Sequence, residues 1–186
     1  MKKTIRIYLN APITIGFVLI CLAVLLLDFI TNGTTTRLFF CTYQSSLFDP
    51  FTYIRLVGHV FGHANLSHFM NNMLYILLLG PILEEKYHKK MINVILITAV
   101  VTGVAHVFIS PNSALLGASG VVFAFILLAS VTGREKGIPM TLILTAILYI
   151  GREIYTGVVS QDSISQLTHI IGGISGAVLG MSFKDR

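Results

Sequence analysis

Apolar residues in this chain gather into long, nearly unbroken runs separated by short polar segments. A helix that crosses a bilayer needs roughly 20 predominantly apolar residues, and a helix satisfies its backbone hydrogen bonds without water. The runs therefore predict an all-α polytopic membrane protein with a bundle of six spans. We place the spans at residues 11–30, 66–83, 91–109, 115–132, 138–155 and 166–183. Arg152 and Glu153 interrupt the fifth run, and we expect the helix to continue to about Tyr155 with both charges reaching the interface.

The composition indicates lipid as the solvent of this protein. Of the 186 residues, 54% are hydrophobic and 11% are charged, and the mean hydropathy is +0.81. About a quarter of the residues in a soluble domain are charged, so we expect a single integral membrane domain over residues 1–186. The first run is longer than the roughly 7–15 apolar residues of a signal peptide, and we expect an uncleaved span. The two cysteines are too few for a disulfide framework.

Basic residues are unequally distributed between the two sets of connecting segments. Ten of the thirteen fall on the side of the two termini: Lys2, Lys3, Arg6, Lys86, Lys89, Lys90, Arg134, Lys136, Lys184 and Arg186. The other side has Arg37, Arg55 and Arg152. Because short cytoplasmic segments carry the excess of Lys and Arg, both termini are predicted to be inside. The net charge of +5 is dispersed over short loops, so it does not indicate a nucleic-acid partner.

Residues 31–65 form the longest connecting segment, which the predicted orientation puts outside. The segment is rich in Phe and Tyr and has few charges for its length. Because aromatic residues favour the membrane interface, we expect short helices lying in the outer headgroup layer. An ordinary solvated loop is the alternative. The short chain and the lack of a targeting segment favour a prokaryotic plasma (inner) membrane.

Polar and ionisable residues collect at the predicted outer ends of spans two, four and six. Ser119 lies about one turn into span four, and His169 lies at a similar depth in span six. The start of span two carries His63, His68 and Asn72. Such side chains are rare at membrane depth and by default indicate a functional site. We therefore predict that these residues, which are distant in sequence, form one site towards the outer side.

The surroundings of Ser119 and His169 favour catalysis over packing. A serine in a membrane helix often bonds the carbonyl four residues before it, but Gly117 and Gly120 leave this hydroxyl accessible. The start of a helix also offers free N–H groups to a developing oxyanion. Glycines follow His169 at i+3, i+7 and i+11, and they let span six approach a neighbouring span closely. If this neighbour is span four, the imidazole and the hydroxyl can come within hydrogen-bonding distance. Simple packing is the alternative reading of these glycines, and we expect His106 to be a packed, hydrogen-bonded histidine.

His68 and Asn72 are four residues apart and share one face of span two. Both side chains can donate hydrogen bonds, as an oxyanion requires. A metal site that gathers His59, His63, His68 and His169 is the alternative. The sequence lacks an H-E-x-x-H pair, and the spacing from His63 to His68 is not the chelating i, i+4. We therefore expect neither a metal nor a cofactor.

Three short motifs occur in a particular order along the chain. Residues 63–72 fit H-x4-H-x3-N at the start of span two, residues 117–120 fit G-x-S-G, and residues 169–176 fit H-x2-G-x3-G. Together they resemble the motifs of the rhomboid family of intramembrane serine proteases. The layout of six spans with a large first outer loop is also similar, which extends the resemblance over essentially the whole chain.

The resemblance implies a role for each matching residue. Ser119 would be the nucleophile and His169 its general base, in a dyad without a third acid. His68, Asn72 and the backbone N–H of Ser119 would stabilise the oxyanion. The residues supporting the site would be His63, Gly117, Gly120 and Phe123, and those with structural roles would be Arg55, His59, Glu84, Gly172 and Gly176.

The chain departs from the family pattern at two positions. The tryptophan that precedes the loop arginine is Ile54 here, and the aromatic residue four positions after the serine, often tyrosine, is Phe123. A phenyl ring can still pack against His169, but it lacks the hydroxyl. Inactive relatives lose the serine or the histidine, and this chain keeps both.

The predicted function is that of a serine endopeptidase that hydrolyses peptide bonds in or near transmembrane segments. Its partners would be transmembrane protein substrates and the lipid bilayer, and no oligomeric state is predicted. Two alternatives are a non-proteolytic relative that binds membrane clients and a small transporter or proton channel. The transporter would need polar residues in the inner halves of spans two, four and six, which are mostly aliphatic or glycine.

Overall fold

The computed structural model describes residues 8–131, 137–160 and 163–183. Within these residues the chain is almost entirely helical, and an isolated β-bridge joins Thr42 to Leu115. The helices are α1 (Pro12–Ile30), α2 (Thr34–Phe39), α3 (Pro50–Gly58), the 3-10 helix η1 (His59–Phe61), α4 (Leu66–Tyr87), α5 (Lys90–Ile109), α6 (Ser119–Ser130), α7 (Met140–Ser160) and α8 (Ser163–Ser182). The all-α prediction is confirmed.

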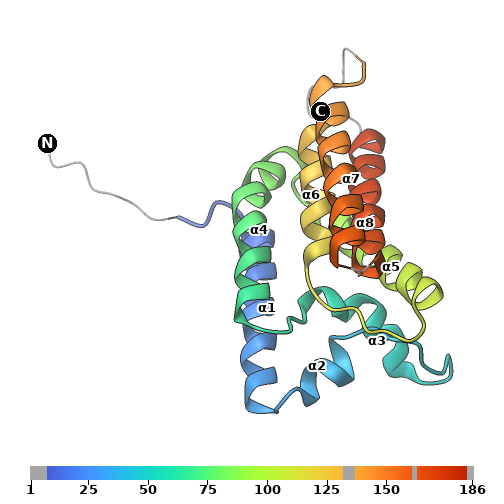
Figure 1. Cartoon of the computed structure of the whole chain (residues 1–186). Helices are drawn as coiled ribbons and strands as arrows, with labels where there is room; N and C mark the ends of the chain where they lie inside the picture. Colours follow the sequence, from blue (N-terminus) through green and yellow to red (C-terminus); the bar gives the residue numbers. More distant parts are fainter. Residues whose placement is uncertain (1–7, 132–136, 161–162, 184–186) are drawn as a thin grey trace, which may run out of the picture.

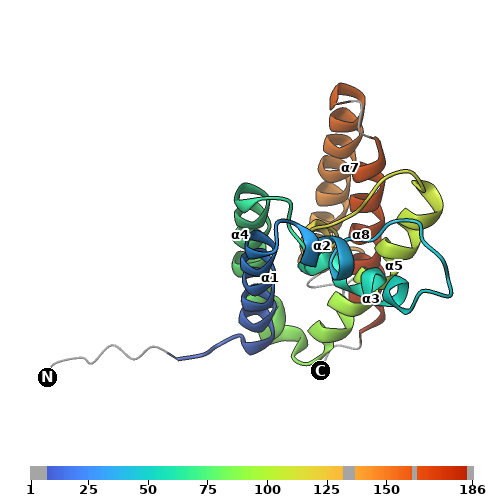
Figure 2. The same ribbon diagram turned by 90° about the horizontal axis from the view of Figure 1, so that it is seen from below.

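The six helices of the bundle alternate in direction along the chain (Figure 1). As a result, α4, α6 and α8 all begin at one end of the bundle, which we name the site end. The short helices α2 and α3 lie across this end (Figures 1 and 2). The prediction of short helices within residues 31–65 is confirmed, while their place in the headgroup layer stays a prediction.

Three of the described helices, α1, α4 and α5, are long and apolar enough to cross a membrane. The apolar stretches Ser119–Ser130 and Met140–Arg152 are shorter, so the count of six spans and their orientation stay predictions. Most of the basic residues on which the orientation rests, at 2–6, 134–136 and 184–186, lie outside the described residues. Two helices extend beyond the predicted spans, since α4 continues past residue 83 and α7 past residue 155. Hydropathy marks the apolar part of a helix, and the backbone stays helical beyond it.

The predicted fourth span was too long, because α6 has only twelve residues and begins at Ser119. Leu115 exchanges two backbone hydrogen bonds of 2.8 and 2.9 Å with Thr42, and the N–H of Gly117 donates to the carbonyl of His59 at 2.9 Å. Gly117 has a φ of +123°, outside the helical range. These bonds to the first loop keep the chain non-helical up to Ser119, which is the first residue of its helix and not one turn into it.

Glycines of α8 allow this helix to pack closely on α6. A Cβ atom at Gly172 would collide with the backbone of Gly120, and one at Gly176 would collide with the backbone of Ala124. Helix backbones approach this closely only where small residues line the contact. The predicted close approach of the sixth span to a neighbour is confirmed, and the neighbour is α6 in the predicted fourth span.

The first turn of α1 is capped by a carboxylate from α4. Its own N-cap residue, Ala11, provides no side-chain acceptor. Oε1 of Glu84 accepts a hydrogen bond from the N–H of Ile13 at 2.9 Å, and Oε2 accepts two from the N–H and Oγ1 of Thr14, both at 2.8 Å. An anion is favourable at the positive end of a helix, so Glu84 fixes α1 against α4.

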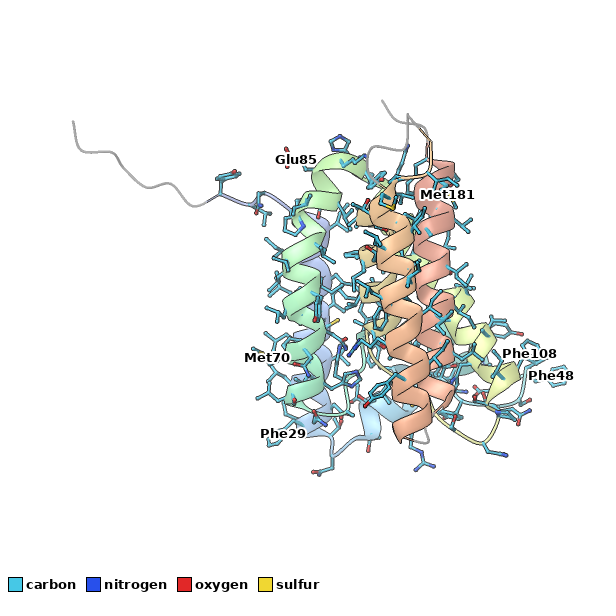
Figure 3. All side chains as sticks on the ribbon, turned by 45° about the horizontal axis from the view of Figure 1, so that its top comes forward. Phe29, Phe48, Met70, Glu85, Phe108 and Met181 are labelled. Atoms are coloured by element: carbon cyan, nitrogen blue, oxygen red, sulfur yellow. The ribbon has the colours of Figure 1, made fainter. Side chains whose placement is uncertain are left out.

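The distribution of side chains is that expected in lipid. Large apolar side chains are exposed along α1, α4, α5 and α7, as Figure 3 shows, whereas Arg55 and Glu84 are buried. Lipid tails solvate apolar side chains, so ionisable groups are placed inside the bundle. The exposed Phe29 and Phe48 mark the site end, and Glu85 lies at the opposite end (Figure 3).

Candidate active site

Ser119 and His169 come together although fifty residues separate them. Ser119 is the first residue of α6, and His169 lies in the second turn of α8. The Oγ atom of Ser119 is 2.9 Å from Nε2 of His169, a hydrogen-bonding distance. When the neutral imidazole carries its proton on Nδ1, the serine hydroxyl donates to Nε2. This geometry allows the histidine to accept the serine proton directly.

The ring of His169 is positioned by an aromatic stack. Phe123, one turn after Ser119, packs against the imidazole with 4.7 Å between the ring centroids. Tyr149 of α7 packs in turn on Phe123, at 4.4 Å. The phenyl ring therefore packs against the histidine as the sequence predicted, and it links the histidine to α7.

Gly117 brings two polar side chains of α4 beside Ser119. A Cβ atom at this position would lie 2.6 Å from Cε1 of His68 and 3.7 Å from Nδ2 of Asn72. Both side chains are thus next to the backbone two residues before Ser119. Within the described part of the chain, Nδ2 of Asn72 is buried and has no hydrogen-bond partner. A buried donor without a partner costs about 1–3 kcal/mol, so this amide is poised to bind an oxygen atom of a ligand.

The start of α6 supplies backbone donors to the same region. The first bond at this helix end runs from the N–H of Val122 to the carbonyl of Ala118, at 2.9 Å. The N–H groups that precede it, including that of Ser119, have no acceptor within the helix. The positive end of the helix dipole adds to the attraction for a negative oxygen.

These groups line an open cavity of about 330 Å³ between α4, α6, α7 and α8. The lining includes residues that the sequence analysis did not assign to the site: Asn71, Tyr75, Arg152 and Gln166. Asn71 and Tyr75 follow His68 and Asn72 by three residues on α4, so a shared helix face would have identified them. Arg152 also lines this cavity and is exposed, and its expected reach to the membrane interface stays a prediction. The side chain of Glu153 lies outside the described residues.

His59 and His63 form the base of the site without lining this cavity. His59 is buried, and its Nε2 lies 3.3 Å from Oγ1 of Thr102 on α5. His63 is also buried; its Nδ1 lies 3.2 Å from the carbonyl of Phe61, and its ring packs edge-on against that of His68. Burial lowers the pKa of each of these two loop histidines from 6.5 to about 4, so both are neutral at pH 7.

Arg55 is buried within the first loop and connects its segments. Its Nη2 lies 2.8 Å from Oδ2 of Asp49 and 2.9 Å from Oγ of Ser45, and its guanidinium stacks over the ring of Tyr43. The hydrogen bond from Arg55 holds the pKa of the Asp49 carboxyl below its ordinary value. Ile54, at the position of the family tryptophan, is 47% exposed and takes no part in these bonds.

The described residues contain no group of three His, Cys, Asp or Glu side chains that could hold a metal ion. The loop histidines bond to the loop and to α5, and His169 bonds to Ser119. His106 is buried, and its Nε2 lies 3.3 Å from the carbonyl of Ser113, as expected for a packed histidine. The cavity therefore presents hydrogen-bond donors beside the hydrogen-bonded pair of Ser119 and His169.

Comparisons with known proteins agree with this arrangement. A family model described as the rhomboid domain matches residues 50–186. The chain is also similar to Rhomboid-related protein 1 of Caenorhabditis elegans, with 33% identity over 139 residues. The matched segment covers 68% of this chain and 38% of that protein, so the chain spans less than half the length of this relative.

Proposed function

The chain belongs to the rhomboid family and is an integral membrane protein, and from this premise we propose that it is an intramembrane serine endopeptidase. Its substrates would be membrane proteins, cleaved in or near a transmembrane segment. The observation that carries the proposal is the 2.9 Å hydrogen bond between Ser119 and His169 within an open cavity. A serine hydroxyl is a weak nucleophile until an adjacent base accepts its proton.

In the proposed reaction, Oγ of Ser119 attacks the substrate carbonyl carbon while Nε2 of His169 accepts the hydroxyl proton. The oxyanion that forms accepts hydrogen bonds from Asn72, His68 and the backbone N–H of Ser119. The imidazolium then donates its proton to the leaving amine, and an acyl-enzyme remains. Water, deprotonated by His169, hydrolyses the ester and regenerates the serine.

The length of α6 supports a site at membrane depth. Its twelve residues rise about 18 Å, whereas the hydrocarbon core of a bilayer is about 30 Å thick. When Ser130 is placed at one boundary of the hydrocarbon core, Ser119 lies about 12 Å inside the opposite boundary. The open, partly polar cavity offers a path for the water that hydrolysis requires, since lipid supplies none. A substrate helix must unwind to reach Ser119, so we expect cleavage to favour segments rich in Gly or Pro.

A fluorophosphonate probe, which reacts with activated serines, tests the proposal. We expect the probe to label Ser119, and Ser119→Ala or His169→Ala to abolish labelling and to slow cleavage of a model transmembrane substrate at least about 10³-fold. Ser175→Ala is the matched control, because Oγ of Ser175 donates to the carbonyl of Ile171 in its own helix. It should retain labelling and cleavage.

Two outcomes would count against a protease. Cleavage at the normal rate by the Ser119→Ala variant would exclude the proposed nucleophile. A wild-type protein that binds transmembrane peptides, without labelling or cleavage, would favour the non-proteolytic client-binding alternative.

A further inference from the structure

Two buried polar atoms in the wall of the cavity that contains Ser119 have no hydrogen-bond partner within the described residues. One is Nδ2 of Asn72 on α4, and the other is Oε1 of Gln166 on α8. A buried polar group without a partner costs free energy, and such groups are rare in folded proteins. The first atom is a donor and the second an acceptor. The cavity is therefore complementary to a ligand that has both a carbonyl oxygen and an N–H or O–H group.

Gln166 and His169 are neighbours on α8. Gln166 precedes the histidine by three residues, so the two side chains share one face of the helix. Asn72 lies on α4, and α6, which begins at Ser119, packs against both α4 and α8 (Figure 1). The cavity therefore has an unpaired donor on the α4 side of the serine and an unpaired acceptor on its α8 side.

The proposed reaction gives a substrate a direction across these two sides. The carbonyl oxygen that Ser119 attacks is bound by Asn72, on the α4 side. The leaving nitrogen must approach His169 on α8, because the imidazolium donates its proton to this atom. The part of the substrate that follows the leaving nitrogen therefore passes α8, where Gln166 lines the cavity.

An unwound substrate brings unpaired backbone N–H groups to this wall. A transmembrane helix satisfies these groups internally, but a segment that opens to reach Ser119 does not, and lipid supplies no acceptor. The cavity must therefore provide acceptors for the substrate backbone as well as donors for the oxyanion. Oε1 of Gln166 is an acceptor of this kind that no group within the described residues already uses.

We propose that Oε1 of Gln166 binds a backbone N–H of the substrate on the C-terminal side of the scissile bond, an inference that rests on the proposed protease function. Side chains three residues apart on a helix have Cβ atoms about 5–6 Å apart, and an extended chain rises about 3.3 Å per residue. The N–H that Gln166 binds therefore belongs to the second or third residue after the scissile bond. Proline has no N–H, so the enzyme selects against proline at this residue.

The test replaces one backbone amide of a model transmembrane substrate by an ester, which has no N–H, at the second or the third residue after the cleaved bond. The wild-type chain should cleave the all-amide substrate with a kcat/KM about tenfold above that for one of the two esters. Gln166→Leu has no acceptor and should abolish this ratio, whereas Gln166→Glu keeps an acceptor oxygen and should retain it. Gln44→Leu removes an exposed glutamine outside the cavity and should keep the wild-type ratio.

Thermal unfolding of the same variants separates substrate binding from a structural role. Because Oε1 of Gln166 has no partner within the described residues, Gln166→Leu should leave Tm unchanged or raise it. A lower Tm, together with an equal loss of activity on the amide and ester substrates, would overturn the proposal and give Gln166 a structural role.

Fluorophosphonate labelling separates this proposal from the proposed function. A labelled, active wild-type enzyme that cleaves the amide and both ester substrates equally overturns the role of Gln166 and leaves the protease intact. A Gln166→Leu defect confined to hydrolysis of the acyl-enzyme, and equal for all substrates, also overturns the proposal and assigns Gln166 to the attacking water. A wild-type chain that is neither labelled nor active removes both proposals.

Discussion

Because Gly117 has no side chain, His68 and Asn72 can lie beside Ser119. Alanine at this position would put a Cβ atom against the His68 ring and would hold a φ of +123° that L residues rarely adopt. We expect Gly117→Ala to lower kcat/KM at least about 10²-fold, because small displacements of catalytic groups are this costly. Gly33→Ala is the matched control, since its φ is +83° but no atom lies within 4 Å of the new Cβ. Equal losses of activity in the two variants would contradict this account.

His59 and His63 make stability depend on pH. Their pKa values are about 4 in the folded protein and about 6.5 when exposed, so the unfolded chain binds protons more readily between these values. Their contribution to the free energy of unfolding is complete above pH 6.5 and falls as the pH drops towards 4, by about 3 kcal/mol per histidine. We expect Tm in detergent to decrease over this range.

Single substitutions test whether the loop histidines cause the pH dependence of stability. His63→Gln should make the decrease in Tm shallower, since one depressed pKa is removed. His88→Gln, which alters an exposed histidine at the opposite end of α4, serves as the control. A decrease in His63→Gln as steep as that of the wild type would show that another group is responsible.

At the residue scale, the sequence could predict the approach of His169 to Ser119 because polar groups at membrane depth have few partners available. The stacking of Phe123 on the imidazole was predictable only from the resemblance to the rhomboid motifs. The place of Arg152 in the cavity wall was not, because a charge near a predicted span end is already explained by the interface. The contact of His59 with Thr102 depends on how the first loop crosses α5, which no local pattern records.

At the scale of helices, the contact between α6 and α8 depends on residues without side chains. Alanine at Gly176 would place a Cβ atom against the backbone of Ala124 and separate the two helices. We expect Gly176→Ala to lower both Tm and activity, because His169 would move away from Ser119. Gly151→Ala on α7 meets no atom within 4 Å and should be neutral or stabilising by up to about 1 kcal/mol. Wild-type behaviour of Gly176→Ala would show that the close approach is dispensable.

The carboxylate of Glu84 holds α1 on the bundle through three hydrogen bonds. Glu84→Gln removes the negative charge and leaves one acceptor oxygen for the three donors of Ile13 and Thr14. We therefore expect the free energy of unfolding to fall by about 2 kcal/mol or more. Glu85→Gln, an exposed neighbour on the same helix, should change it little. Thermal unfolding in detergent, measured for the two variants side by side, compares them directly. An equal change in both would remove the capping explanation.

Helix positions in this bundle were predictable from apolar runs, but helix ends were not. The apolar run at residues 115–132 reads as a continuous span, yet its first four residues are held outside the helix by bonds to the first loop. Conversely, α4 continues through Pro81 to Tyr87 because its polar last turn remains helical. Tertiary hydrogen bonds to the first loop decide the first case, and they join residues far apart in the sequence.

At the scale of the whole molecule, the predicted orientation places the first loop outside the membrane and the opposite end of the bundle inside. Phe48 is 99% exposed at the site end, and Glu85 is exposed at the other end (Figure 3). A membrane-impermeant maleimide should label Phe48→Cys in intact cells, and Glu85→Cys only after permeabilisation. Cys21 and Cys41 are buried, so they should contribute little background. Labelling in the reverse order would overturn the predicted orientation.

The general architecture could be predicted from the sequence because few backbone structures can span a lipid bilayer. Helices joined by short segments must alternate in direction, and this alternation brings the starts of α4, α6 and α8 to one end (Figure 1). The sequence did not predict the path of the first loop beyond its short helices. Its pairing with Leu115 spans more than seventy residues, and its network around Arg55 is built from ordinary loop residues.

The two hydrogen bonds between Thr42 and Leu115 attach the segment before Ser119 to the first loop, whereas His169 belongs to α8. Ser119 and His169, the proposed nucleophile and base, therefore have separate supports, and in the predicted orientation the loop is reachable from the aqueous phase. An antibody fragment that displaced the loop would misalign the serine without occupying the cavity. Such inhibition would be non-competitive, and its agent would never have to partition into the bilayer.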